Sequence, residues 1–128
     1  MRVLVCGGRD YGIGKPDEWV SMFRVLAGNH ERHYFTAIIE GGAPGADAGA
    51  RTFGEQNGIP VLTFNADWKT HGKAAGPIRN QRMINEGKPD LVIAFPGGKG
   101  TADMVRRARA AGIEVREIAP TPAIERRA

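Results

Sequence analysis

The stretch LVIAFPGGKGTADM, residues 91–104, contains the unit from which the whole chain is built. Residues 91–95 form a continuous apolar run, which is typical of a strand covered on both faces of a parallel sheet. A proline and two glycines at 96–98 end the run, and residues 101–111 then show the apolar spacing of a helix. Open α/β sheets repeat this order of strand, turn and helix, so the stretch predicts such a sheet.

The same order recurs along the rest of the chain. Four further runs rich in apolar and β-branched residues predict strands at residues 3–6, 35–40, 60–64 and 113–118. Helical patterns predict helices at residues 16–26, 47–57, 78–86 and 101–111. The sequence therefore predicts one α/β domain over residues 1–120, with an open parallel sheet of about five strands and helices on both faces. Residues 121–128 are expected to form a C-terminal tail.

Two segments depart from this regular order. The run at 113–118 alternates apolar and polar residues, which indicates an edge strand. Residues 65–77, NADWKTHGKAAGP, show neither a helical nor a strand period. Because connections of that length in a small domain are usually functional or disordered, we expect this polar segment to contribute to a site.

Composition limits the class of protein. With 128 residues, 41% hydrophobic and 25% charged, the chain has the size and composition of one globular domain. No apolar run reaches the roughly 18 residues of a membrane-spanning helix, and the chain does not begin with the pattern of a signal peptide. The single cysteine, Cys6, lies in an expected strand and suits a reducing compartment. We therefore expect a cytoplasmic protein with a buried, unreactive thiol.

The charge pattern fits a small anionic partner as well as it fits nucleic acid. The formal net charge is +4, but the basic residues are dispersed, and the 7% of aromatic residues do not interleave with them as a base-stacking surface requires. His30, His33 and His71 lack metal-ligand spacing with one another or with the cysteine. The sequence predicts neither a metal site nor a cofactor.

Three of the expected strands end in a pair of glycines: Gly7-Gly8, Gly41-Gly42 and Gly97-Gly98. Parallel strands bring their carboxyl ends to one edge of the sheet, which is where ligands of open α/β folds bind. Glycine lets a ligand approach the backbone and permits turns whose N–H groups converge on an anion. The pairs therefore predict a phosphate-binding edge. Neither GxGxxG nor GxxxxGK[ST] occurs, so the sequence indicates neither a standard NAD enzyme nor a Walker-type ATPase.

Candidate site residues follow from this edge and from the long connection. The expected ligand-binding residues are Gly7, Gly8, Arg9, Gly42, Gly45, Asp47, Trp68, Asn80, Gly97, Gly98, Lys99, Gly100 and Thr101. Trp68 either stacks on a base or is buried in the core. Asp47 and Asp103 either act on the ligand or are ordinary carboxylates in the first turn of their helices. For the helix that contains Asp103, the ordinary reading makes Thr101 the N-cap. Arg79 lies in the first turn of its expected helix, where a cation opposes the helix dipole, so we expect an anion beside it.

Three segments in this order resemble one protein family: GGAPGAD at 41–47, DWKTHGKAAGPIRNQRM at 67–83 and AFPGGKGTADM at 94–104. The chain resembles the YspA-related branch of the SLOG superfamily, named after the Smf/DprA proteins and the LOG phosphoribohydrolases. The resemblance implies a Rossmann-like domain that binds nucleotides or nucleotide-derived ligands and forms a homo-oligomer. LOG members hydrolyse the N-glycosidic bond of riboside monophosphates.

The LOG resemblance also assigns catalytic candidates. LOG enzymes have an arginine four residues before a methionine, which Arg79 and Met83 match, and a PGGxGTxxE motif. Here PGGKGT matches that motif up to its threonine, but Met104 stands at the position of the glutamate, and Asp103 is the nearest carboxylate. Arg79 and Asp103 are therefore the expected catalytic pair if the chain is an enzyme.

Three functional hypotheses result. The first is binding of a nucleotide or nucleotide-derived ligand, as in a sensor of such a signal. The second is a phosphoribohydrolase acting on a nucleoside 5′-monophosphate. The third, which the dispersed charge disfavours, is DNA binding.

Overall fold

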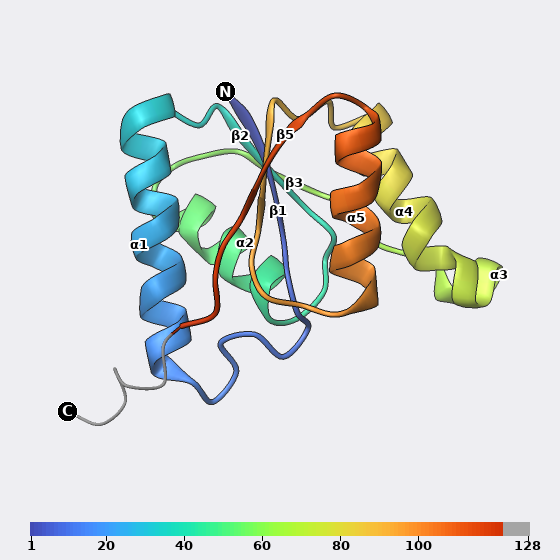
Figure 1. Cartoon of the computed structure of the whole chain (residues 1–128), viewed down its shortest axis with the longest axis horizontal. Coiled ribbons are helices and arrows are strands. Elements are labelled where there is room, and N and C mark those ends of the chain that lie inside the picture. The colour runs from blue at the N-terminus through green and yellow to red at the C-terminus, as the bar shows by residue number, and fades with distance from the viewer. Residues whose placement is uncertain (122–128) are drawn as a thin grey trace.

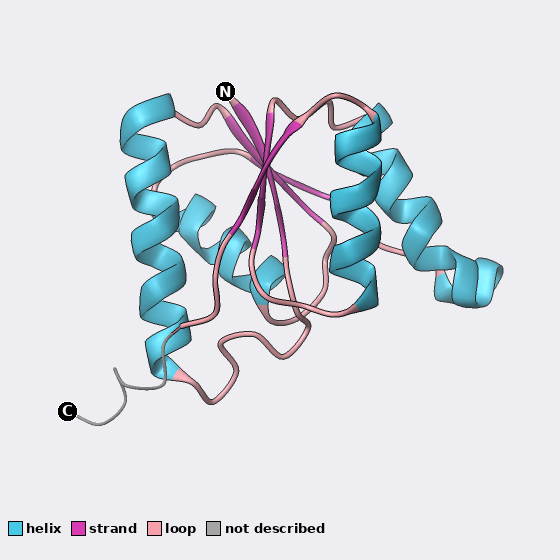
Figure 2. Ribbon diagram, viewed as in Figure 1, coloured by secondary structure: helices cyan, strands magenta, loops and turns pink. Residues whose placement is uncertain are grey.

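The computed structural model describes residues 1–121, which form a five-stranded, fully parallel sheet in the order β3-β2-β1-β4-β5 (Figures 1 and 2). The strands are β1 (Arg2–Cys6), β2 (Ala37–Glu40), β3 (Val61–Thr63), β4 (Leu91–Ala94) and β5 (Glu114–Glu117). All five expected strands are present, and the open α/β fold is confirmed. The predicted tail at 121–128 lies outside the described residues, apart from its first residue.

The middle of the sheet is strand β1, which pairs with β2 on one side and with β4 on the other. Val3 is opposite Ile38 in β2 and opposite Leu91 in β4. The two outer strands are β3 and β5, so the prediction of an edge strand at 113–118 is confirmed. Strand order reverses between β1 and β4, and ligands of such sheets bind at the carboxyl ends of the strands near that reversal.

Two pairs of helices cover the two faces of the sheet (Figure 1). One face lies against α1 (Pro16–His33) and α2 (Ala46–Gln56), and the other against α4 (Ala75–Asn85) and α5 (Lys99–Ala110). Side chains of β1 alternate between these layers, as the period of two in a strand requires. Val3 and Val5 belong to the core beneath α1 and α2, whereas Leu4 and Cys6 belong to the core beneath α4 and α5.

Helix ends agree best with the prediction where a glycine marks them. Helices α2 and α5 stop just before Gly58 and Gly112, whose φ angles of +66° and +77° suit the residue after a C-cap. Helix α1 instead continues to His33, beyond the predicted end at residue 26. Residues 28–30 are weak helix formers and interrupt the apolar pattern in the sequence. Leu26 and Asn29 are nevertheless buried, and their packing stabilises the helix beyond residue 26.

The prediction that residues 65–77 lack regular structure is wrong. They contain the single-turn helix α3 (Trp68–His71), the 3₁₀ turn η1 (Gly72–Ala74) and the first turn of α4. The Asp67 carboxylate caps α3 by accepting a hydrogen bond of 3.1 Å from the Thr70 amide. A helix of one turn is too short to produce an apolar period, which is why the pattern did not reveal it. No helix within residues 1–121 is long and apolar enough to cross a membrane.

Candidate functional site

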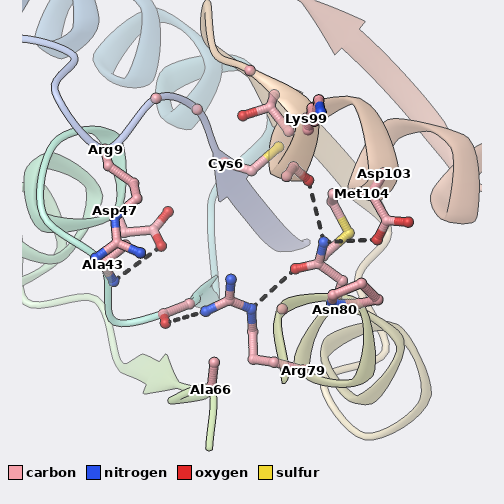
Figure 3. Close-up of a pocket in the computed structure, with 18 of the residues that line it drawn as sticks. Cys6, Arg9, Ala43, Asp47, Ala66, Arg79, Asn80, Lys99, Asp103 and Met104 are labelled. Atoms are coloured by element: carbon pink, nitrogen blue, oxygen red, sulfur yellow. Dashed lines mark hydrogen bonds between the residues drawn. The ribbon is translucent and has the colours of Figure 1, made fainter. Parts of the chain in front are cut away.

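A cavity of about 1010 Å³ opens at the carboxyl ends of β1, β2 and β4, beside the reversal of strand order (Figure 3). The three double-glycine turns meet there because the Gly8 backbone links them. The Gly8 amide donates to the Pro96 carbonyl at 2.9 Å, and the Gly8 carbonyl accepts from the Ala46 amide at 3.1 Å. The topology therefore joins turns that are far apart in the sequence into one rim, as predicted.

Every predicted site residue except Gly45 and Gly97 lines this cavity. Those two glycines instead allow the turns to touch. A Cβ at Gly45, where φ is +75°, would collide with the Gly8 carbonyl, and a Cβ at Gly97 would lie 2.8 Å from the Gly8 amide nitrogen. They therefore shape the rim of the cavity from behind and do not face a ligand.

The amino end of α5 faces the cavity with free backbone donors. The helix begins at Lys99 with Gly98 as its N-cap, and no side chain among the described residues caps it. Thr101 is thus the third residue of the helix, and the expectation that it is the N-cap is wrong. Gly98, Lys99, Gly100 and Thr101 all line the cavity, so the uncapped N–H groups of the first turn are available to an anion.

The Arg79 guanidinium is held from two sides at the floor of the cavity. Its Nη1 donates to the Gly41 carbonyl at 2.6 Å and its Nε to the Asn80 side-chain oxygen at 3.0 Å. Burial lowers the pKa of Arg79, an effect that the nearby Asp47 opposes. The remaining nitrogen, Nη2, has no partner among the described residues, so an anion in the cavity could bind it.

The buried Asn80 side chain connects Arg79 to α5. Asn80 accepts from Arg79, and its amide nitrogen donates to the Gly100 carbonyl at 3.2 Å and to Asp103 Oδ2 at 3.0 Å. These bonds use both amide hydrogens and fix the orientation of the Asn80 oxygen toward Arg79. Asn80 therefore links Arg79 to the glycine turn at the start of α5 by hydrogen bonds.

The Asp103 carboxylate is bound by protein groups on both oxygens. Oδ1 accepts from Arg106 at 2.7 Å, and Oδ2 accepts from Arg107 at 2.8 Å in addition to Asn80. Burial alone would raise the pKa of Asp103, but the hydrogen bonds from Arg107 and Asn80 outweigh burial, and the pKa is lowered. Asp103 lines the cavity as an ionised group whose charge is already balanced.

Asp47 also lines the cavity, but its pKa is raised, whereas that of Asp103 is lowered. Asp47 is the second residue of α2 and is only 7% exposed. Its side chain receives hydrogen bonds from the backbone of Ala43, at 3.2 Å, and of Gly41. Burial raises the pKa of Asp47 to about 6, and the charge of Glu40 adds to that effect.

A family model described as the YspA, cpYpsA-related SLOG family matches residues 1–71. The chain is also 36% identical over 121 residues to the Gene 61 protein of Mycobacterium phage D29, a match that covers 89% of this chain and 93% of the phage protein. The chain belongs to the YspA, cpYpsA-related SLOG family.

Two solved structures show how widely the fold of this SLOG chain is shared. The crystal structure of TM1055 is similar with a TM-score of 0.64 and 19% identity, over 89% of this chain and 71% of that one. The DNA processing protein A (DprA) of Streptococcus pneumoniae is similar with a TM-score of 0.72 and 21% identity, over 95% of this chain but only 51% of DprA. At these identities the likeness establishes the fold.

The position of the LOG glutamate is apolar in this SLOG chain. Met104, which stands there, is 1% exposed and lines the cavity with Met83 and Cys6. Burial raises the pKa of Cys6 to about 12, so the thiol is protonated and behaves as an apolar group. This part of the cavity presents sulfur-containing side chains in the place where the LOG motif has a carboxylate.

The structure answers the open question about Trp68 and adds residues that the sequence did not single out. Trp68 is 49% exposed and lines the cavity, so the alternative of a core tryptophan is wrong. Lys73 also lines the cavity from η1, although it was predicted only as part of a polar connection.

The fully buried Glu40 lies behind this cavity, and its Oε1 accepts a hydrogen bond of 2.7 Å from the Gly42 amide. No cluster of three metal-ligating side chains occurs within residues 1–121.

Proposed function

We propose that this chain binds a nucleotide or nucleotide-derived ligand in the cavity at the carboxyl edge of the sheet. The observation that supports this most directly is the uncapped amino end of α5, which opens into a cavity of about 1010 Å³ walled by glycine turns. Backbone N–H groups at a helix start bind phosphate by charge-assisted hydrogen bonds, each contributing roughly 1.5–3 kcal/mol. Membership of the SLOG family agrees with a ligand of this type.

The charges around the cavity favour an anionic ligand. Five cationic side chains line it: Arg9, Lys73, Arg79, Lys99 and Arg106. Three carboxylates line it as well, but Asp103 is paired with Arg106 and with Arg107, which leaves four cationic side chains and two carboxylates to act on a ligand. The half-exposed ring of Trp68 adds a flat apolar surface on which a base could stack.

Calorimetric titration tests the proposal. The ligands are nucleoside 5′-monophosphates, ADP-ribose and cyclic nucleotides, and we expect at least one to bind. Arg79→Ala should weaken that binding by about tenfold or more, because one charge-assisted hydrogen bond is lost. Arg82→Ala is the matched control, since Arg82 is on the same helix but pairs with the exposed Glu86. Absence of heat from every ligand with folded protein would contradict the proposal.

A second function, hydrolysis of a nucleoside 5′-monophosphate, is favoured by one observation. Arg79 and the PGGKGT turn, which match the LOG motifs, line the same cavity. Against it, Met104 replaces the glutamate and both Asp103 oxygens are engaged. Ribosyl transfer passes through a cationic transition state that a free carboxylate stabilises.

Incubation with nucleotides separates the two functions. We expect chromatography to show no release of free base while binding is retained. Release that disappears in both Arg79→Ala and Asp103→Asn would establish the enzyme, and release that persists in both would indicate a contaminating activity.

A further inference from the structure

The carboxylate of Asp47 lines the cavity and, within residues 1–121, forms no ion pair at 4.0 Å or less, although the charge of Arg79 acts on it from a greater distance. It is 7% exposed, and the hydrogen bonds that it receives within the described part of the chain come from the backbone of Gly41 and Ala43. An ionised carboxylate can accept about four hydrogen bonds, so a bound ligand would complete its partners.

The charge of the cavity restricts what that ligand group can be. A ligand attracted by the excess of cationic side chains in the cavity is anionic, and a second anion beside Asp47 would be repelled. The group that reaches Asp47 is therefore a neutral hydrogen-bond donor. Hydroxyl groups are donors of this kind, and a nucleotide carries them on its sugar, next to its phosphate.

A phosphate at the start of α5 would favour the sugar over the base as the group that reaches Asp47. Figure 3 shows the Asp47 carboxylate and Lys99 on opposite sides of the cavity. Lys99 belongs to the turn at the start of α5 where the phosphate is expected, and Trp68, the stacking surface for a base, belongs to α3. A phosphate on the α5 turn leaves the sugar as the next group to extend across the cavity.

We infer that Asp47 binds ribose hydroxyls of the ligand and makes the site select ribonucleotides over 2′-deoxyribonucleotides. This inference rests on the proposed function. A carboxylate can accept hydrogen bonds from both hydroxyls of the 2′,3′ pair, and a 2′-deoxy sugar removes one of them.

The alternative role for Asp47 is purely local. Asp47 is the second residue of α2, where the helix dipole stabilises an acidic side chain. The hydrogen bond that it accepts from the Ala43 amide also orders the turn before the helix. That role involves no ligand group. It predicts that a change at Asp47 affects ribonucleotides and deoxyribonucleotides equally, so the comparison of the two sugars distinguishes the roles.

The test is a calorimetric comparison of ribonucleoside 5′-monophosphates with their 2′-deoxy counterparts. It uses the intact chain, Asp47→Asn and the control Asp10→Asn, which removes an exposed carboxylate that also lines the cavity. The intact chain should bind a ribonucleotide about 10- to 100-fold more tightly than its deoxy form, which corresponds to one hydrogen bond to a charged group. Asp47→Asn should lose most of this preference, and Asp10→Asn should keep it.

Several outcomes would overturn the inference. Equal affinity of the intact chain for both sugars would do so, and this measurement decides the matter even if Asp47→Asn fails to fold. A preference that persists in folded Asp47→Asn, or an effect of the variant that follows the base and not the sugar, would also do so. Absence of binding by all nucleotides would contradict the proposed function together with this inference, whereas equal binding contradicts the inference alone.

Discussion

Gly41 is the residue at which Arg79 and Asp47 both come close to the backbone. A Cβ built at Gly41 would lie 2.6 Å from Arg79 Nη1 and 2.9 Å from Asp47 Oδ2. We predict that Gly41→Ala displaces both side chains, weakens nucleotide binding by about tenfold or more and lowers the free energy of unfolding by about 1–3 kcal/mol. Calorimetry and urea denaturation measure the two effects.

Gly28→Ala is the control for Gly41→Ala. Gly28 lies inside α1, and nothing within 4 Å would meet its added Cβ. Alanine is the better helix former by about 0.5–1 kcal/mol, so this variant should be stabilised and bind normally. If Gly41→Ala bound ligand as well as Gly28→Ala, the close contact at Gly41 would have no functional meaning.

Asp47 should give the stability of the protein a distinct pH dependence. Burial raises its pKa from 3.8 to about 6, so between these values the folded chain holds a proton that the unfolded chain has released. The free energy of unfolding therefore falls as the pH rises through this range, and the ionised group costs about 3 kcal/mol above pH 6. We expect Asp47→Asn to be more stable than the intact chain at pH 8, with the gain shrinking toward pH 4.

Urea denaturation of the two proteins across this pH range measures that difference. A gain of the same size at every pH would show that ionisation of Asp47 is not its cause. A stability cost at a position that faces a cavity is common where function and stability conflict, and it agrees with a role for Asp47 in ligand binding.

At the scale of elements, Asp103 joins α4 to α5. It binds Asn80 of α4 and Arg107 of its own helix, and Arg107 in turn donates to Gln81 of α4 at 3.0 Å. We predict that Asp103→Ala lowers the free energy of unfolding by about 1–3 kcal/mol, because the buried Asn80 amide loses an acceptor. Nucleotide binding should weaken as well, since Asn80 then no longer fixes Arg79.

The matched comparison for Asp103 is Glu86→Ala, which breaks the Arg82–Glu86 pair of α4. Both of those side chains are about half exposed, at 49% and 55%, and exposed pairs contribute roughly 0–1 kcal/mol. Equal losses of stability in the two variants, measured by urea denaturation, would mean that Asp103 does not connect the helices.

Sequence reasoning recovered the elements that have strong periods or clear end signals. The inner strands β1, β2 and β4 and the glycine-terminated ends of α2 and α5 were predicted because burial on both faces and positive φ angles leave direct marks in the sequence. The outer strand β5 was predicted from its alternation of apolar and polar residues. Helix α3 was missed because one turn is shorter than the period that reveals a helix. For Asp103 the sequence left open a role on the ligand or an ordinary place in the first turn. The structure makes it the fifth residue of α5, and its bond to Asn80 was not predicted because Asn80 comes from a different helix.

At the scale of the whole molecule, the place of the site was predictable but its inner wall was not. Parallel strands with glycine ends must bring their turns to one edge, and the structure confirms that arrangement. The approach of Lys73 and the grouping of Cys6, Met83 and Met104 depend on how α4 and α5 lie against the sheet. No local sequence pattern encodes that packing.

Ligand binding should stabilise the whole domain. A ligand that binds only the folded chain adds about 2.7 kcal/mol at a concentration one hundred times its Kd. The nucleotide selected by calorimetry should therefore raise the midpoint of thermal unfolding by several degrees, and Arg79→Ala should reduce the shift at the same ligand concentration. A nucleotide that binds tightly yet leaves the midpoint unchanged would have to bind the unfolded chain equally well, which would argue against the cavity as its site.

The central position of β1 has a consequence for the order in which the protein is made. Residues 2–6 are synthesised well before their partner on one side, which is β4 at residues 91–94. Until that strand has been synthesised, one edge of β1 stays unpaired and the apolar side chains beneath it stay uncovered. Because the cavity needs turns from both sides of β1, a nascent chain acquires its ligand site only after β4 and the turn that follows it have been synthesised.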